Sequence, residues 1–455
     1  MRKILNTAML LFIITIMLAG RGGAKAEAKQ SRDLRIAIIG AGASGLTAAY
    51  YLKNAGYENI TVYEKEPRVG GKVYSYTYDD HTFELGALWV EEYYRIVYGL
   101  AFKYGIDLQP EEADIVIRDS NNTNYASPLA YVSARYDSSE IESAYINYEK
   151  VQLKFKSLNK PGFEGADPEL FMTFDKFAEK YQIEPIAYGF ATFWTNAGYG
   201  YYHEVPALYV LKLMLPNLKG PGPYVDTLGR APDGLQRLWE KVAADLEDVR
   251  LNHTVEKVKR NDSGNSASIE VTANGLTETF DRIIISSDLK ESLNFIDASE
   301  EEQELFSQVQ SNNYNVHIVR ADGIPYQVGT MVLLAKNTVP ESIGHIMAIV
   351  GRETSPGVWT SYQLAPWGTS SDDIANLLQE DVKQLGGHVE SIIIQKRWSY
   401  FPHVKSQSLY DGFYDRMEAL QGKNGTYYIG GIMNFEAVEN TCEYAEKIVA
   451  TYFLR

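Results

Sequence analysis

A strand, a glycine-rich turn and a helix between Arg35 and Glu64 constrain the fold more than any other stretch of this chain. Ile36 to Ile39 form an apolar run of strand length, and the pattern G-x-G-x-x-G then opens an Ala-rich helix. Such a turn binds the diphosphate of a dinucleotide, because glycines admit the phosphates and the helix N-terminus offers free N–H groups. The predicted cofactor contacts in this turn are Gly40, Ala41, Gly42, Ala43, Ser44 and Gly45.

The second strand of this unit ends at an acidic residue. Ala55 and Gly56 stop the helix, and Ile60 to Tyr63 form a strand that leads to Glu64. In dinucleotide-binding folds an acid about 20 residues beyond the glycines accepts a hydrogen bond from a ribose hydroxyl. Glu64 is therefore predicted to bind the adenosine ribose, and Lys65 beside it to line the same site.

Residues 1–26 have the pattern of a secretory signal peptide. Arg2 and Lys3 precede an apolar core from Ala8 to Ala19, and Ala24-Lys25-Ala26 supplies small residues for cleavage. The core is shorter than the roughly 20 apolar residues of a spanning helix, so we expect no stable membrane span after signal removal. The pattern predicts export, to the medium, the periplasm or the cell envelope, with an uncleaved anchor as the alternative.

The composition narrows the range of partners. A chain of 455 residues with 45% hydrophobic residues can bury the cores of two domains. A formal charge of −16 argues against nucleic acid and anionic lipid as partners. The histidines have no metal-ligand spacing, so a small-molecule substrate is the expected partner and no metal is predicted.

A second glycine segment follows the ribose acid. Gly70-Gly71-Lys72 can bring backbone N–H groups and a positive side chain to a diphosphate, and Phe83-Glu84-Leu85-Gly86-Ala87 follows it. With these segments the sequence resembles the flavin-containing amine oxidase superfamily, which holds FAD with the first βαβ unit, the GG-(Arg/Lys) segment and a later glycine turn. The resemblance implies FAD contacts at Gly71, Lys72, Gly86, Ala87 and Leu88.

The middle of the chain has several distinct parts. Residues 93–224 are Tyr-rich, and we expect them to be helical and to belong to a substrate domain. Val249 to Val255 is predicted as a short strand, and the resemblance implies that the backbone of Val255 meets the adenine. Asn274-Gly275 predicts a hairpin within Ile269 to Phe280, and Arg282 to Ser287 is predicted as a buried strand. Further strands are expected around residues 316–319, 331–334 and 345–350.

The C-terminal segment predicts a second strand, turn and helix. Tyr427 to Ile429 is strand-like, and Ala437 to Phe453 is an amphipathic helix. The turn between them can aim backbone N–H groups at the flavin end of the cofactor. The predicted contacts in this turn are Gly430, Gly431 and Met433.

Further motifs narrow the resemblance. Gly198-Tyr199-Gly200, Val205 to Lys212, Gly344 to Met347, Trp398 to Val404 and the closing Tyr-x-Gly-x-Ile-Met are similar to FAD-dependent polyunsaturated fatty acid double-bond isomerases. This resemblance implies an α/β fold with a Rossmann-like FAD-binding domain of the glutathione-reductase type, interleaved with an α+β substrate domain. The FAD-binding domain is predicted over residues 32–95, 226–287 and 396–455, and the substrate domain over 96–225 and 288–395.

The resemblance also implies a reaction. A hydride between two cis double bonds moves to flavin N5 and returns to an end carbon, which leaves the double bonds conjugated. The protein must hold the chain over the ring, exclude water and grip the carboxylate. The predicted substrate contacts, for which core packing is the alternative role, are Trp89, Tyr199, Trp398, Tyr400 and Phe401, with Leu88 beside them.

Four positions depart from the isomerase pattern. Ile115 to Ile117 stand where an arginine would hold the carboxylate, and Arg118 is the nearest substitute. Tyr224 is the closest match to an aromatic residue expected before Asp233-Gly234-Leu235. Ala197 replaces an aromatic residue, and Gly431 replaces an acid after the last conserved glycine, which removes an expected cofactor hydrogen bond.

Two other functions remain open from the sequence. A secreted amine or L-amino-acid oxidase would send a hydride from an amine carbon to the same flavin and yield peroxide. A protein that uses flavin only structurally is the third possibility. The single cysteine, Cys442, lies within the closing helix, where a core thiol is expected, so FAD is predicted to be noncovalent.

Overall fold

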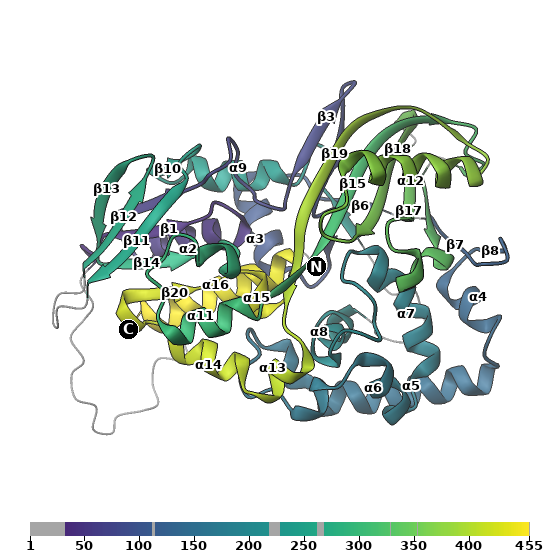
Figure 1. Ribbon diagram of the computed structural model, residues 1–455, viewed down its shortest axis with the longest axis horizontal. Coiled ribbons are helices and arrows are strands. Elements are labelled where there is room, and N and C mark those ends of the chain that lie inside the picture. The colour runs from purple at the N-terminus through teal and green to yellow at the C-terminus, as the bar shows by residue number, and fades with distance from the viewer. Residues whose placement is uncertain are drawn as a thin grey trace, which may run out of the picture. The chain divides into compact units, whose positions relative to one another are not determined.

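The computed structural model describes residues 32–111, 114–217, 228–261, 268–327, 329–352 and 354–454 (Figure 1). The predicted signal peptide and Tyr224 lie outside these residues. No helix in the described ranges is both long and apolar enough to cross a membrane.

A five-stranded parallel sheet forms the nucleotide-binding part of the fold. Its strands come from distant parts of the chain, in the order β10-β2-β1-β14-β20. They are β1 (Ile36–Ile39), β2 (Ile60–Tyr63), β10 (Asp248–Arg250), β14 (Arg282–Ile285) and β20 (Thr426–Tyr428). Every residue of β1 is buried, as expected for a parallel strand covered on both faces. The predicted α/β fold with a Rossmann-like sheet is confirmed.

Helices from both ends of the described chain pack together beside this sheet. The helix α2 (Ala43–Asn54) follows the first glycine turn, and α16 (Val438–Tyr452) packs against it (Figure 1). The helix α3 (Arg95–Tyr104) contacts α16, and α9 (Gln236–Ala244) contacts α2. The helices α3 and α9 also contact each other. This packing brings the two strand-turn-helix segments predicted from the sequence to one end of the same sheet.

A three-stranded antiparallel sheet lies in the same part of the chain. It contains β11 (Val255–Asn261), β12 (Ser268–Ala273) and β13 (Leu276–Phe280). Asn274 and Gly275 both have positive φ, 48° and 75°, which confirms the predicted two-residue hairpin turn. The single strand predicted from Val249 to Val255 is wrong, because Asn252 has a φ of 55° and turns the chain between β10 and β11.

The largest sheet has seven strands, in the order β19-β15-β18-β17-β16-β7-β8. They are β7 (Asp114–Arg118), β8 (Asn124–Tyr125), β15 (Gln310–Asp322), β16 (Thr330–Leu334), β17 (Ile346–Arg352), β18 (Ser355–Ala365) and β19 (His388–His403). The predicted strands near residues 316, 331 and 345 are confirmed. The strand β19 pairs with β15 on both sides of the predicted domain boundary at 395/396, and the domain limits stay a prediction.

The two faces of the seven-stranded sheet pack against different partners. On one face, Ile117, Tyr314 and Trp398 join an apolar cluster with Phe83 and Leu85. The other face packs against α12 (Ser371–Gln384) through a second cluster that includes Val332, Leu378 and Val382. The first face is the one that contributes side chains to the cavity described below.

The described part of residues 93–224, which is 93–111 and 114–217, is mainly helical, as predicted, but it also contains strands. The helices are α4 (Pro128–Ser133), α5 (Ser138–Lys154), α6 (Phe174–Tyr181), α7 (Glu184–Asn196) and α8 (Ala207–Asn217), with the 3-10 turns η1 (Lys156–Asn159) and η2 (Pro168–Phe171). The prediction missed β6 (Gln109–Glu111), β7 and β8. The strand β7 was missed because only its long-range pairing with β16 identifies it as part of a sheet.

Short elements complete the described chain. Two small sheets contain β3 (Ser75–Tyr78) with β4 (His81–Glu84), and β5 (Val90–Glu91) with β9 (Leu228–Arg230) and β6. The remaining helices are α10 (Leu289–Ser292), α11 (Glu300–Ser307), α13 (Ser406–Tyr410), α14 (Phe413–Leu420) and α15 (Gly431–Asn434). The remaining 3-10 turns are η3 (Ala335–Asn337), η4 (Pro340–Ser342) and η5 (Lys423–Gly425).

Candidate functional site

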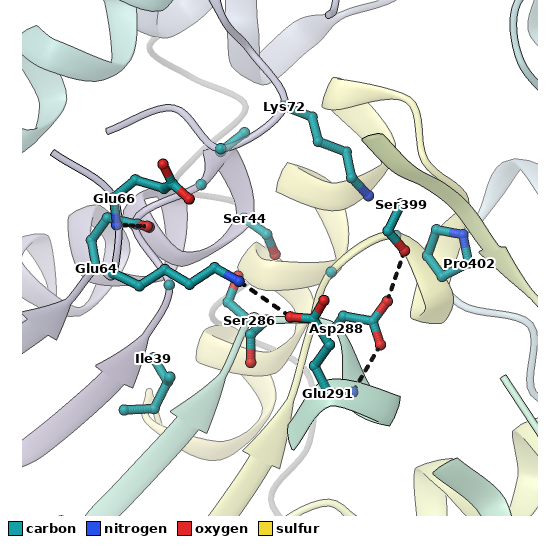
Figure 2. A pocket seen from close by; sticks show the side chains of 18 of the residues that line it. Ile39, Ser44, Glu64, Glu66, Lys72, Ser286, Asp288, Glu291, Ser399 and Pro402 are labelled. Atoms are coloured by element: carbon teal, nitrogen blue, oxygen red, sulfur yellow. Dashed lines mark hydrogen bonds and ion pairs between the residues drawn. The ribbon is translucent and has the colours of Figure 1, made fainter. Parts of the chain in front are cut away.

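A cavity of about 820 Å³ lies at the carboxyl ends of the parallel strands (Figure 2). Ile39, Glu64, Ser286 and Ile429 mark the ends of β1, β2, β14 and β20 on its wall. Ligands of open α/β sheets bind at this edge, and the volume is within the range of about 300–1,000 Å³ typical of ligand sites. The predicted cofactor residues that line it are Gly40, Gly42, Ala43, Ser44, Glu64, Lys65, Gly71, Lys72, Ala87, Val255, Gly430 and Gly431.

The first glycine turn needs its glycines for two different reasons. Gly40 has a φ of 105°, which side-chain-bearing residues rarely adopt. A Cβ on Gly45 would lie 2.0 Å from the carbonyl oxygen of Gly40, so α2 could not pack this closely on the turn. Gly45 and Ala41 do not line the cavity. Gly45 permits the packing, and the backbone N–H of Ala41 donates to Glu64 Oε2 at 2.8 Å.

The Glu64 carboxylate is held in place by backbone on both sides. Besides the bond from Ala41, its Oε1 accepts a hydrogen bond from the backbone N–H of Glu66 at 2.9 Å. Lys65 extends across this part of the cavity and forms an ion pair with Glu291 at 3.2 Å. These contacts fix an acceptor at the end of β2, where the sequence predicted one.

The second glycine segment is organised by a residue that the predictions left out. The Arg68 guanidinium donates to the carbonyl of Gly71 at 2.8 Å, stacks over the Tyr74 ring and lines the cavity. Burial lowers the pKa of Arg68. Gly86 is needed for packing and does not line the cavity, because its Cβ would lie 1.8 Å from the carbonyl oxygen of Lys72. A basic residue two places before a glycine pair was the signal available in the sequence.

The turn after β14 brings further polar groups that sequence reasoning missed. Ser286 and Ser287 follow β14 and line the cavity, and their buried hydroxyls have no partner among the described residues. Their place at the carboxyl end of a parallel strand was the available signal. Gly430, with a φ of 110°, makes the turn after β20. Met433 is buried and does not line the cavity.

Lys72 and Glu436 form an ion pair on the cavity wall. Lys72 Nζ lies 2.6 Å from Glu436 Oε1, and the glutamate side chain is 7% exposed. Burial raises the pKa of the Glu436 carboxyl, and the Lys72 ammonium acts in the opposite direction. In Figure 2 Lys72 points toward the part of the cavity where Ser399 and Pro402 lie, away from Glu64 and Glu66. Sequence reasoning did not identify Glu436.

Aromatic side chains from β19 form the other wall of the cavity. Trp398 and Tyr400 line it, and Trp398 Nε1 donates to the carbonyl of Leu85 at 2.6 Å. The Tyr400 ring stacks on Tyr199, with ring centroids 5.7 Å apart. Tyr199 and Phe401 are buried behind Trp398 and Tyr400 and do not themselves line the cavity. We call Trp398, Tyr400, Tyr199 and Phe401 the aromatic wall.

Other predicted substrate residues lie away from the cavity. Arg118 Nη1 donates to the Tyr326 hydroxyl at 3.0 Å, and Arg118 Nη2 donates to Asn122 Oδ1 at 3.2 Å. Tyr326 packs on the α12 side of the large sheet, opposite to Ile117, so β7 directs Arg118 away from the aromatic wall. Trp89 Nε1 donates to Glu111 Oε2 at 3.3 Å. Leu88 and Trp89 pack against the apolar cluster and do not line the cavity.

The cavity fits a dinucleotide. At Gly42 and Gly71 the wall has no side chains, and a Cβ on Gly71 would lie 3.0 Å from the Gly42 Cα. The unpartnered serine hydroxyls offer hydrogen bonds to a ligand, and Glu64 offers a fixed acceptor. No group of three or more His, Cys, Asp or Glu side chains suited to a metal ion occurs in the described ranges.

The sequence model of the family described as flavin containing amine oxidoreductase matches residues 43–419. The chain belongs to the flavin-containing amine oxidoreductase family. It is accordingly an FAD-dependent isomerase or oxidoreductase. The cavity residues are those that would hold FAD.

Several individual proteins are similar to most of the chain. The crystal structure of a fatty acid isomerase from P. acnes that produces CLA has a TM-score of 0.85 and 26% identity, over 93% of this chain and 100% of that chain. The polyenoic fatty acid isomerase of Ptilota filicina is 23% identical over 78% of this chain and 75% of its own length. An FAD-dependent oxidoreductase of Cochliobolus heterostrophus is 25% identical over 87% of this chain and 86% of its own length.

Proposed function

We propose that this chain is an FAD-dependent isomerase that converts methylene-interrupted double bonds of a polyunsaturated fatty acid to conjugated ones. The observation that carries the proposal is the similarity, over nearly the whole chain, to a fatty acid isomerase of known structure. A second fatty acid isomerase among the sequence relatives supports it. The aromatic wall supports it as well, because a hydrocarbon chain needs an apolar and dry surface.

Residues on the cofactor side hold FAD in this proposal. The backbone of Gly40 and Gly42 would approach the diphosphate, together with the hydroxyls of Ser286 and Ser287, and the backbone of Gly430 would face the flavin end of the cofactor. Glu64 accepts a hydrogen bond from the adenosine ribose. FAD, when bound, supplies the ring nitrogen N5, which accepts a hydride and returns it.

The aromatic wall positions the substrate and excludes water. Trp398 and Tyr400 contact the hydrocarbon chain of the fatty acid, and Tyr199 packs against the Tyr400 ring on the side away from the cavity. Burial raises the pKa of both tyrosines, so their phenols stay neutral at physiological pH. Neutral rings give a hydrocarbon segment an apolar surface to pack against.

The proposal includes noncovalent FAD. Cys442 is buried in α16, its sulfur accepts a hydrogen bond from Thr47 Oγ1 at 3.2 Å, and it does not line the cavity. Burial raises the pKa of the thiol, which disfavours the reactive thiolate. Acid precipitation should release all the flavin into the supernatant. Flavin that stays in the washed precipitate would contradict noncovalent binding.

Export is also part of the proposal, and its support is the charge and hydrophobicity pattern of residues 1–26. Fractionation of the source cells, followed by N-terminal sequencing of the exported chain, tests it. We expect a mature N-terminus near residue 27. Full-length chain found only inside the cells would contradict export.

The reaction is tested by incubating the purified FAD-loaded protein with linoleic or arachidonic acid. Near-ultraviolet absorbance reports conjugated dienes or trienes, while peroxide and oxygen are measured in the same sample. We expect conjugation without peroxide or oxygen uptake, because the hydride returns to the substrate and no net oxidation occurs. Protein freed of its flavin is the matched control.

Other outcomes lead to other functions. Peroxide formed from amines or amino acids, with no conjugation of either fatty acid, would replace the proposal with an oxidase. An FAD-loaded protein that gives neither signal would refute the substrate assignment and leave the cofactor assignment intact.

A further inference from the structure

The two oxygens of the buried Glu436 carboxylate differ in their partners. Its Oε1 is paired with Lys72 at 2.6 Å, whereas Oε2 has no hydrogen-bond partner among the described residues. The side chain is 7% exposed and lines the cavity. A buried carboxylate oxygen without a partner is costly unless a ligand supplies a donor.

This oxygen lies where a side chain on Gly431 would begin. A Cβ built on Gly431 would be 2.4 Å from Glu436 Oε2. The resemblance described in the sequence analysis implies an acid at this position, where this chain has Gly431. The carboxylate of Glu436 and the absence of a side chain at 431 therefore fit each other.

The backbone before Glu436 turns the chain back toward Gly431. Phe435, which lies between α15 and α16, has a φ of 82°, a value that residues with side chains seldom adopt. Its ring packs against Tyr199 and Phe401, with centroids 4.9 and 5.5 Å away. The aromatic packing holds this uncommon conformation, which places the next residue on the cavity wall.

The chemistry of the position selects the partner. A diphosphate is anionic and would be repelled by Glu436, and the adenosine ribose already has an acceptor in Glu64. The polyol chain of FAD joins the diphosphate to the ring and carries hydroxyl donors. Lys72 on Oε1 stabilises the charged form of the carboxylate and leaves Oε2 as an acceptor.

We propose that Glu436 takes the place of the acid missing at position 431 and accepts, at Oε2, a hydrogen bond from a hydroxyl of the FAD polyol chain. Lys72 is the positioning residue for this carboxylate. The inference rests on the FAD dependence of the family and on the cofactor site proposed above. It does not depend on the fatty acid substrate.

FAD affinity is the direct test. Apoprotein of each variant is titrated with FAD, and the quenching of flavin fluorescence gives the Kd without any substrate. Glu436→Ala should bind FAD about 10- to 100-fold more weakly, the range expected for loss of a hydrogen bond to a charged group. Glu302→Ala is the matched control, because Glu302 is a buried acid in an ion pair with Arg260 at 2.6 Å and does not line the cavity. Its FAD affinity should equal that of wild type.

A swap of the two positions tests the geometry. Gly431→Glu alone should bind FAD poorly, because the new side chain collides with Glu436. Gly431→Glu combined with Glu436→Ala should recover FAD affinity to within about threefold of wild type, since one acid again occupies the space. Recovery in the double variant would show that FAD affinity depends on a carboxylate in this part of the cavity, whichever of the two residues carries it.

FAD affinity equal to wild type in Glu436→Ala would overturn the proposal. If the melting temperature of that apoprotein were lower at the same time, the pair of Glu436 with Lys72 would be a structural ion pair only. If Glu436→Ala does not fold, Glu436→Met is titrated instead. It keeps a side chain of similar length but has neither the charge nor an oxygen acceptor, so FAD affinity equal to wild type would again overturn the proposal. Failure of the fatty acid assay leaves this test unaffected.

Discussion

The two sides of the cavity differ in the groups that form them, which are mainly backbone on one side and aromatic side chains on the other. The cofactor side consists largely of backbone from short glycine segments, such as Gly40 to Gly45 and Gly70 to Lys72. The aromatic wall consists of rings from distant parts of the chain, with Tyr199 after α7 and Tyr400 on β19. The cofactor side therefore depends on the absence of side chains at a few positions. The aromatic wall depends on how several side chains pack.

The largest effect is expected where an added methyl group meets backbone on the cofactor side. Gly45→Ala places a Cβ 2.0 Å from the Gly40 carbonyl oxygen, and neither group can move without separating α2 from β1. We expect a loss of about 4 kcal/mol or more in the free energy of unfolding, and protein purified without flavin. Denaturant titration and the flavin absorbance of the purified protein measure both effects.

Gly99→Ala is the matched control for this substitution. Gly99 is also a helical glycine, in α3, but an added Cβ there meets nothing within 4 Å. The control should bind FAD normally and gain up to about 1 kcal/mol, because alanine favours a helix. If Gly45→Ala behaved like this control, the turn would not need its glycine.

A second prediction concerns a buried acid outside the cavity, next to Leu85, which accepts a hydrogen bond from Trp398 of the aromatic wall. Glu84 ends β4 and accepts hydrogen bonds from the Leu235 backbone N–H at 2.8 Å and from Ser75 Oγ at 2.7 Å. Burial raises its pKa to about 7, above the value of about 4.3 in an unfolded chain. The folded state therefore keeps a proton that the unfolded state loses, and stability should fall as pH rises from about 4.3 to 7.

Glu84→Gln removes this proton equilibrium and keeps both hydrogen-bonding positions. Relative to wild type, it should remove a pH-dependent loss of about 3–4 kcal/mol, because one pKa unit corresponds to about 1.4 kcal/mol. Denaturant titrations from pH 4 to 8 measure the difference in slope. Parallel profiles for the two proteins would mean that Glu84 does not titrate in this range.

A third prediction concerns a substitution that should disturb the aromatic wall and leave the cofactor side intact. Gly198 has a φ of 88°, and its Cβ would lie 2.9 Å from Tyr400 Cδ1 and 3.0 Å from Tyr314 Cδ2. Gly198→Ala should displace these rings and cost about 1–3 kcal/mol in stability. We expect about tenfold slower conjugation of linoleic acid, with FAD affinity within twofold of wild type.

Gly105→Ala separates the ring collision from the backbone cost. Gly105 also has a positive φ, 66°, but its added Cβ meets nothing within 4 Å. It should lose about 1 kcal/mol of stability and keep full activity. If both variants lost activity equally, the effect of Gly198→Ala would come from the backbone and not from Tyr400.

The same contrast explains how far the sequence could predict the site. The first βαβ unit was predictable to the residue, because the pattern from Ile36 to Glu64 is local and each glycine has a local reason. Ser286, Ser287 and Glu436 were missed because they reach the cavity only when distant strands and turns come together. The backbone at Phe435, which turns Glu436 back, has no signature in the sequence.

The alternation of side chains along a strand explains why Arg118 does not reach the cavity. Arg118 was chosen by proximity in sequence, within a region predicted to be helical. In the structure β7 pairs with β16, and successive side chains of a strand point to opposite faces of a sheet. Ile117 therefore packs toward the aromatic wall, and Arg118 lies on the face that packs against α12.

The smallest effect is therefore expected for Arg118→Ala. Its guanidinium is occupied by Tyr326 and Asn122, and it does not line the cavity. The KM for linoleic acid should change by less than about twofold, because a surface contact of this kind contributes at most a few tenths of a kcal/mol to binding elsewhere. Trp398→Ala is the contrasting variant, since that ring does line the cavity and should change the KM more than Arg118→Ala does. A rise in KM of tenfold or more in Arg118→Ala would mean that the carboxylate of the substrate reaches the α12 face of the sheet, and that the substrate path extends beyond the aromatic wall.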